Sequence, residues 1–142
     1  MIALTVFFWL LTESTPKQTG NVVVNIEGLR NDKGKVAVAI FNGADGFPSK
    51  PDKILQGKIT DITNRKAKAV FENLPFGAYA VVFIHDENEN RDLDTNFIGI
   101  PVEGYGVSNN PRFFFGPPKF VDAAFQLDAP EIVIDLKAKY LL

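Results

Sequence analysis

The sequence predicts an all-β fold, an antiparallel β-sandwich of about seven short strands with one long, elaborated loop. Three observations predict it. Apolar and polar residues alternate with a period of two in several segments, and turn-forming residues separate these segments. No stretch combines a sustained helical period with capping residues. The 142 residues suffice for one domain with a core and are too few for two comfortable ones.

The composition is that of an ordinary soluble globular protein, with 46% hydrophobic and 23% charged residues. The net charge of −2 provides no basic field for phosphate backbones, which argues against nucleic acid as a partner. The chain contains no cysteine, and this removes disulfides, thiolate nucleophiles and the usual zinc and iron–sulfur ligand sets.

An apolar run over residues 1–11 is followed by a polar stretch over residues 12–20. The run is too short to span a bilayer, and its length matches the apolar region of a secretory signal. No Lys or Arg precedes it, and no small-x-small cleavage site follows it. We therefore assign residues 1–20 to a truncated or atypical signal segment and linker, and residues 21–142 to a single β-sandwich domain. A periplasmic or secreted protein without a membrane span in the mature domain is expected; the alternative is that the run forms an N-terminal strand.

Turn chemistry and hydrophobic pattern suggest how the strands connect. The first two expected strands flank the turn residues 31–34 and should form an antiparallel hairpin. The segment 78–85 is apolar on both faces and should be the central strand. Strands are expected at residues 21–27, 36–41, 54–62, 66–72, 78–85, 120–127 and 132–138.

One chemically dense segment, residues 85–110, reads HDENENRDLDTNFIGIPVEGYGVSNN. A simple connection between two strands needs only a few turn residues, whereas this one holds five acidic and amide side chains within residues 86–90 alone. Its length and composition indicate a functional loop.

Two sets of residues carry resemblances to known families. The motif FxxLxxGxY at residues 71–79 resembles the strand–turn–strand signature of transthyretin-like sandwich modules. A second set of motifs resembles the bacterial domain-of-unknown-function family numbered 2141. These motifs are HDENxN at 85–90, LDTN at 93–96, GIP at 99–101 and EGYGxSNN at 103–110. That resemblance covers residues 21–142 and implies a secreted or periplasmic β-sandwich with no established reaction. Arg91 departs from it, because the family tends to carry Gly there.

The acidic part of this segment follows the spacing of a calcium loop. Asp86, Asn88, Asn90 and Asp94 stand at relative positions 1, 3, 5 and 9 of an EF-hand-like loop. Hard Ca²⁺ takes several oxygen ligands, and alternate residues of a tightly wound loop direct theirs inward. Asp92 at position 7 would contribute its backbone carbonyl. The candidate metal ligands are Asp86, Asn88, Asn90, Asp92, Asp94 and Glu103, the last closing the coordination from farther along.

The spacing departs from an EF-hand at two positions. Phe97 stands at position 12 in place of the bidentate Glu, and Arg91 stands at position 6, where Gly adopts the left-handed conformation more cheaply. Two interpretations therefore stay open. The loop is a calcium site, or it is an acidic loop held by Asx-turns and side-chain-to-backbone hydrogen bonds without a metal.

No catalytic residue is predicted. His85, the sole histidine, is expected to be a structural hydrogen-bonder that pins the following loop, with a general base or metal ligand as the alternative. Ser108 lacks the context of a nucleophile elbow. A carboxylate pair such as Asp86 and Glu103 leaves a small, glycan-active hydrolase as the alternative to a non-enzymatic binding or structural module.

An aromatic segment follows the acidic loop and consists of Tyr105 and the three phenylalanines at 113–115. We expect it to pack against the sandwich, since a loop of this length usually folds back on its domain. The alternative is an exposed contact face for an unidentified protein or glycan partner.

Overall fold

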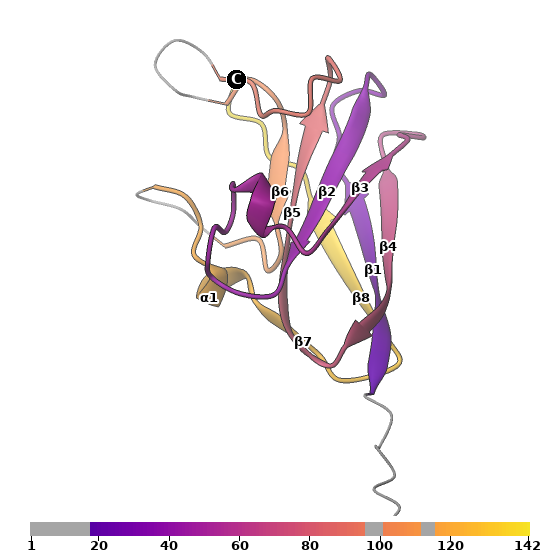
Figure 1. Ribbon diagram of the computed structural model, residues 1–142. Helices are drawn as coiled ribbons and strands as arrows, with labels where there is room; N and C mark the ends of the chain where they lie inside the picture. Colours follow the sequence, from indigo (N-terminus) through magenta and orange to yellow (C-terminus); the bar gives the residue numbers. More distant parts are fainter. Residues whose placement is uncertain (1–17, 96–100, 112–115) are drawn as a thin grey trace, which may run out of the picture.

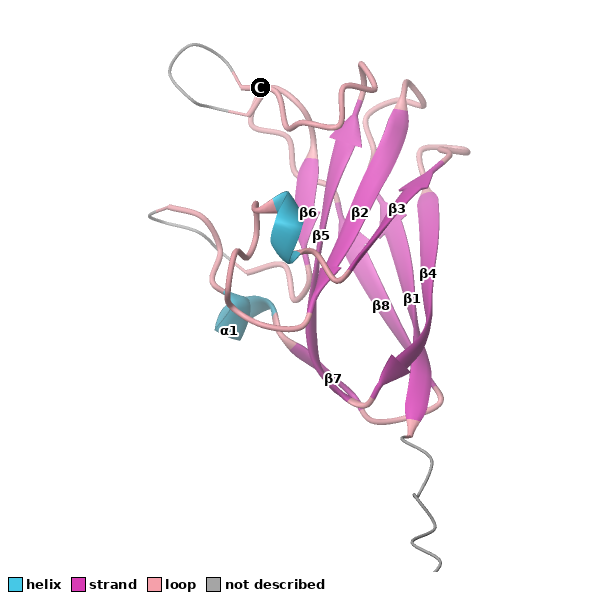
Figure 2. Ribbon diagram, in the orientation of Figure 1, coloured by secondary structure: helices cyan, strands magenta, loops and turns pink. Residues whose placement is uncertain are grey.

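The computed structural model describes residues 18–95, 101–111 and 116–142. Strands dominate it and form two β-sheets that pack face to face, which confirms the predicted all-β sandwich (Figures 1 and 2). The strands are β1 (Thr19–Glu27), β2 (Lys35–Phe41), β3 (Gln56–Thr60), β4 (Ala67–Pro75), β5 (Gly77–Asp86), β6 (Tyr105–Val107), β7 (Phe125–Leu127) and β8 (Glu131–Lys137). Two short helices accompany them, η1 (Pro51–Lys53) and α1 (Phe120–Ala123). None of the described helices is long and apolar enough to cross a membrane.

The smaller sheet has the order β4-β1-β8, and the larger has the order β3-β2-β5-β6 with β7 also paired to β5. The predicted central strand is confirmed, because β5 pairs with β2, β6 and β7. The sequence predicted an antiparallel sandwich, and this is wrong for one strand pair, because β1 and β8 run parallel. β1 begins at Thr19, inside the range that the sequence assigns to the linker.

The predicted hairpin between the first two strands is wrong. β1 pairs with β4 and β8, whereas β2 pairs with β3 and β5, so the two strands lie in different sheets. The connection between them crosses the end of the sandwich, and its Leu29 is only 2% exposed within the core. Alternating burial specifies which face of a strand is inward but not which strand lies beside it.

The predicted strand over residues 120–127 is wrong in its first half, which is the helical turn α1. Side chains from the segment after β6 bind the carbonyl groups of this turn. Ser108 Oγ donates to the Ala123 carbonyl at 2.6 Å, and Asn109 Nδ2 donates to the carbonyls of Asp122 and Ala124 at 3.2 and 2.9 Å. The turn therefore satisfies its backbone without a strand partner, and Val121 points into solvent at 77% exposure.

The core lies between the inward faces of the two sheets. Val22, Val24 and Ile26 of β1 are at most 1% exposed, as are Phe71 of β4 and Phe83 of β5. Each such side chain stabilises the fold by roughly 1.5–3 kcal/mol relative to an exposed one. A second, smaller cluster covers the outer side of the larger sheet, where α1 and the loop before η1 lie.

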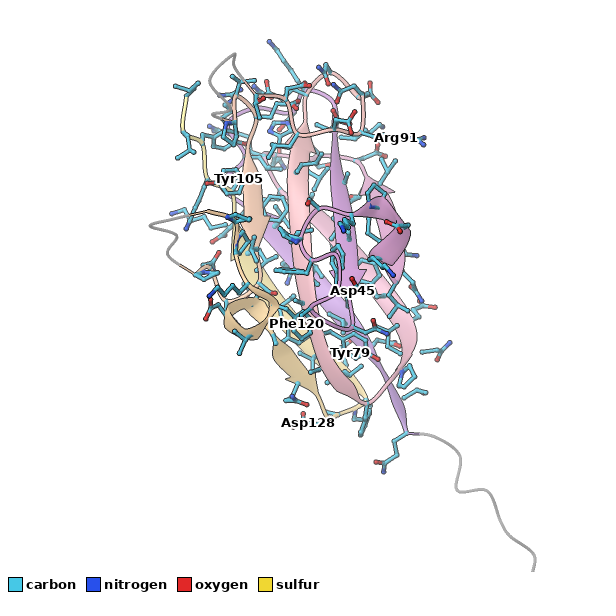
Figure 3. The ribbon with its side chains drawn as sticks, turned by 60° about the vertical axis from the view of Figure 1, so that its left-hand side comes forward. Asp45, Tyr79, Arg91, Tyr105, Phe120 and Asp128 are labelled. Carbon is cyan, nitrogen blue, oxygen red and sulfur yellow. The ribbon has the colours of Figure 1, made fainter. Side chains whose placement is uncertain are left out.

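One end of the sandwich gathers the connections that matter for the site (Figure 1). The β1–β2 connection, the β3–β4 turn, the segment from β5 to β6 and the end of the chain after β8 all lie there. In Figure 3, Arg91 lies at this end, and Asp128 lies at the opposite end.

Candidate metal-binding loop

Residues 86–95, called the acidic loop from here on, wind around the carboxylate of Asp86 at the end of β5. Asp86 is 2% exposed, and its carboxylate accepts the backbone N–H groups of Asn90 at 3.1 Å and Arg91 at 2.6 Å. Arg91 has a φ of 66° and Glu89 a φ of 57°. The left-handed turn for which a calcium loop uses glycine is therefore formed by an arginine.

Three candidate ligands converge on one point in the acidic loop. Asn88 Nδ2 donates to Asp94 Oδ2 at 2.5 Å, and Asn90 Nδ2 donates to Asp94 Oδ1 at 2.7 Å. The hydrogen bond from Asn90, the largest contribution, holds the pKa of the Asp94 carboxyl below its usual value. Positions 3, 5 and 9 of the predicted calcium loop are thus brought together.

Glu103 lies beneath the acidic loop and ties its two ends together. It is 4% exposed, and its carboxylate accepts the N–H of Glu87 at 2.7 Å and the N–H of Asp94 at 3.0 Å. Burial raises the pKa of Glu103, and the neighbouring Asp94 carboxyl raises it further. The sequence predicted Glu103 as a metal ligand. In the structure its carboxylate lies under the other candidate ligands and binds the backbone of the acidic loop.

Asp92 stands apart from the other candidate ligands. Its N–H donates to Asn90 Oδ1 at 3.0 Å, while its exposed carboxylate has no hydrogen bond within the part of the chain that the structure describes. In the same part of the chain, no three His, Cys, Asp or Glu side chains group closely enough to hold a metal by themselves. Amide and backbone oxygens would therefore have to contribute. Phe97, at position 12, lies outside the described residues.

His85 is fully buried, and both of its ring nitrogens are occupied. Nε2 lies 2.7 Å from the Lys33 carbonyl, which can only accept, so Nε2 carries the proton. Nδ1 then accepts from the Tyr140 hydroxyl at 2.8 Å. Burial raises the pKa of the Tyr140 hydroxyl, so that it keeps the proton it donates. His85 thereby joins β5 to the β1–β2 connection and to the end of the chain.

The two side chains considered for hydrolysis in the sequence are occupied by backbone hydrogen bonds. Asp86 and Glu103 are both buried, and each accepts two backbone N–H groups. Neither carboxylate lines the surface hollow formed mainly by residues of β1, β4 and β8 or the one beside Arg30 and Arg65. This geometry offers the hydrolase hypothesis no support.

Ser108 is likewise occupied. It is 1% exposed, accepts the Val81 N–H at 2.9 Å and donates to α1, so it holds α1 against β5. Of the predicted aromatic segment, Tyr105 is half-buried in β6 opposite Ile84. The phenylalanines at 113–115 lie outside the described residues.

Arg30 and Tyr140, which the sequence did not indicate as site residues, support the acidic loop from the outside. Arg30 Nε donates to Glu87 Oε1 at 2.7 Å, and the Arg30 N–H donates to Tyr140 Oη at 3.0 Å. No motif could have found this group, since Arg30 and Tyr140 are 110 residues apart. Only the fold brings these two residues next to each other.

Fold and loop together define a small β-sandwich domain with one self-braced acidic loop at its end. The chain belongs to the family described as "Uncharacterized protein conserved in bacteria (DUF2141)", whose sequence profile matches residues 24–135. This confirms the family resemblance found in the sequence. Searches of curated proteins and of solved structures gave no significant match. The likeness of residues 71–79 to transthyretin-like modules stays a prediction.

Proposed function

We propose that this protein is an extracytoplasmic, non-enzymatic binding or structural module whose acidic loop holds a calcium ion. One observation carries the proposal. The loop winds around Asp86 with Arg91 in the left-handed conformation, and the side chains of Asn88 and Asn90 meet at Asp94. Positions 1, 3, 5 and 9 of a calcium loop thus lie in one tightly wound turn, and their side chains carry the oxygen atoms that Ca²⁺ takes as ligands.

Binding would exchange hydrogen bonds for metal–oxygen contacts. Both amides donate to Asp94, and rotation about the Cβ–Cγ bond would present their oxygens in place of their nitrogens. That rotation gives up the bonds that Asn88 Oδ1 and Asn90 Oδ1 accept from backbone N–H groups. The ion would relieve the repulsion among the five carboxylates at 86, 87, 89, 92 and 94.

Moderate affinity follows from this exchange and from Phe97 at position 12. Without a bidentate glutamate, the loop should resemble extracellular calcium modules, with a dissociation constant of about 10⁻⁴–10⁻³ M. Calcium in that range is found outside the cytoplasm, which agrees with the predicted signal segment. Cell fractionation of the full chain tests this part of the proposal, and recovery in the cytoplasm would contradict it.

Thermal unfolding in calcium and in chelator tests the ion site. At 100 times the dissociation constant, calcium should stabilise the parent by about 2.7 kcal/mol, a shift of several degrees in Tm. Magnesium should do less, because it keeps its waters and demands a stricter octahedron. Asp94→Asn should abolish the shift. The matched control is Glu89→Gln, which removes one charge from an exposed position of the same loop outside the ligand set.

Two results would overturn the proposal. One is an unchanged Tm for the parent in calcium at about 10 mM, well above the expected dissociation constant. The other is a calcium-dependent shift that persists in Asp94→Asn, which would assign the ion to another part of the chain.

A further inference from the structure

The guanidinium of Arg30, in the β1–β2 connection, binds three separate segments of the chain. Nε donates to Glu87 Oε1 at 2.7 Å in the acidic loop. Nη2 donates to the Val102 carbonyl, just before Glu103, and Nη1 donates to the Leu142 carbonyl, both at 2.9 Å. Two of these acceptors are backbone carbonyls, so Arg30 fixes the course of the chain as well as pairing a charge.

Residues 138–142, called the terminal segment from here on, dock around the same arginine. The Tyr140 ring lies 4.8 Å from the Arg30 guanidinium, and its hydroxyl accepts the Arg30 N–H while donating to His85. The ring packs against Gly104, where a Cβ would come within 2.4 Å of it. The Ala138 N–H donates to Glu27 of β1, and Lys139 pairs with Tyr105 of β6.

A continuous hydrogen-bond path runs from the terminal segment to the candidate ligands. Arg30 connects Leu142 to the Glu87 side chain. The Glu87 N–H and the Asp94 N–H both donate to the Glu103 carboxylate. Asp94 in turn accepts the two amides of the acidic loop. Each link joins residues that no single secondary-structure element holds together.

We propose that Arg30 is a positioning residue that couples the acidic loop to the terminal segment, so that the two open and close as one unit. Calcium in the loop then strengthens the docking of the segment, and by linkage the docked segment strengthens calcium binding. The calcium half of this coupling rests on the proposed function. An isolated surface ion pair would contribute little, but the Arg30 guanidinium binds two backbone carbonyls besides Glu87 and stacks on a ring.

Hydrogen exchange on the full chain tests the coupling without calcium. The reporters are the hydrogen-bonded amides of Asn90, Arg91 and Asp94 in the loop, and of Ala138 and Lys139 in the segment. Arg30→Met should accelerate exchange in both groups by about fivefold or more, relative to core amides of β5 that report global unfolding.

The matched control is Arg65→Met, because Arg65 lines the same surface hollow and its side chain has no hydrogen bond or ion pair within the described residues. Its exchange should follow the parent. Exchange in Arg30→Lys should fall between the parent and Arg30→Met, since a lysine keeps the charge but lacks the planar guanidinium whose separate nitrogens reach the three segments. Acceleration confined to the loop, or to the segment, would overturn the coupling.

A second arm adds calcium at about 10 mM, above the expected dissociation constant. The amides of Ala138 and Lys139 should then exchange more slowly in the parent and be unaffected in Arg30→Met. If calcium raises the Tm of the parent but leaves the segment amides unchanged, the coupling fails and the proposed function stands. If calcium does not bind the parent, the calcium half fails together with the proposed function, while the calcium-free comparison still decides whether Arg30 joins loop and segment.

Discussion

Arg91 shows how a residue-level departure from a motif is accommodated by its neighbours. A left-handed residue other than glycine costs roughly 1–2 kcal/mol, and Arg91 nevertheless has a φ of 66°. The buried Asp86 carboxylate accepts its N–H at 2.6 Å and holds the turn in place. Of the four residues in the 1-3-5-9 spacing, Asn88 and Asn90 bind Asp94 through their side chains, whereas Asp86 binds backbone N–H groups. The arginine at position 6 therefore does not prevent the left-handed turn.

The support around the loop could not be predicted in the same way. Asp86 to Asp94 lie within one short stretch, so their spacing is visible in the sequence. The contacts of Arg30 with Glu87 and Tyr140 join residues 57 and 110 positions apart, and only the completed fold brings these residues together.

The Tyr140 hydroxyl is expected to contribute to stability in a way that the Tyr105 hydroxyl does not. Tyr140→Phe leaves the fully buried Nδ1 of His85 without its donor, which should cost about 1–3 kcal/mol. Tyr105→Phe is the control, because the Tyr105 hydroxyl has no hydrogen bond within the described ranges. Urea unfolding of both variants gives the comparison. Equal stability of the two would mean that water replaces the Tyr140 hydroxyl.

The charge of Asp94 should give a pH-dependent contribution to stability. Its pKa in the folded protein is below the ordinary 3.8, mainly through Asn90, so the contribution is complete above that value and is lost as pH falls through the folded pKa. Glu103 has the opposite sign. Its folded pKa is above 4.5, so its ionised form costs stability near neutral pH, and the cost disappears on acidification.

The difference in unfolding free energy between the parent and Asp94→Asn tests the first effect, together with the smaller change that the substitution makes to the pKa of Glu103. In chelator this difference should be constant near neutral pH and shrink below 3.8. Urea titrations at a series of pH values measure it. A difference that stays the same down to the lowest pH would show that Asp94 stabilises the loop by shape and not by charge.

At the scale of elements, the sequence predicted strands better than their partners. β1 and β2 have the expected alternation, yet each pairs with strands distant in sequence, because the connection with buried Leu29 crosses between the sheets. The segment 120–127 failed for another reason. Its apolar and polar residues do alternate, but Ser108 and Asn109 donate hydrogen bonds to carbonyl groups in and next to α1. A helical turn therefore satisfies the backbone hydrogen bonds of this segment without a partner strand.

β3 is an edge strand whose pairing surface is protected by charge. Lys58 lies opposite Val38 and on the same side of the larger sheet, yet it is exposed in β3, which is the edge strand of that sheet. A lysine facing inward on an edge strand disfavours association with a further strand. Ile59, at 53% exposure, and Leu55, at 41%, face the other way.

Lys58→Ile should therefore promote self-association through β3. The variant would have apolar side chains on both faces of an unpaired edge. Sedimentation velocity over a range of protein concentrations measures this, with Lys50→Ile as a control that adds the same side chain to an exposed loop position. A Lys58→Ile protein that stays monomeric at all concentrations would contradict this role for the edge lysine.

At the scale of the whole molecule, the terminal segment connects the two sheets. Ala138 binds β1 of the smaller sheet, and Lys139 pairs with the start of β6 in the larger one. This connection lies at the end of the sandwich that holds the acidic loop (Figure 1). The acidic loop, Glu103 beneath it and the terminal segment therefore lie at the same end of the two sheets.

The most direct test of the calcium proposal is a crystal structure of the full chain grown in about 10 mM calcium, above the expected dissociation constant. We expect one ion with oxygen ligands at about 2.3–2.6 Å. These are the carboxylates of Asp86 and Asp94, the side-chain oxygens of Asn88 and Asn90, and the backbone carbonyl of Asp92. Both amides would have turned from donors to ligands. A structure under these conditions in which Asn88 and Asn90 still donate to Asp94, with no ion between them, would contradict it.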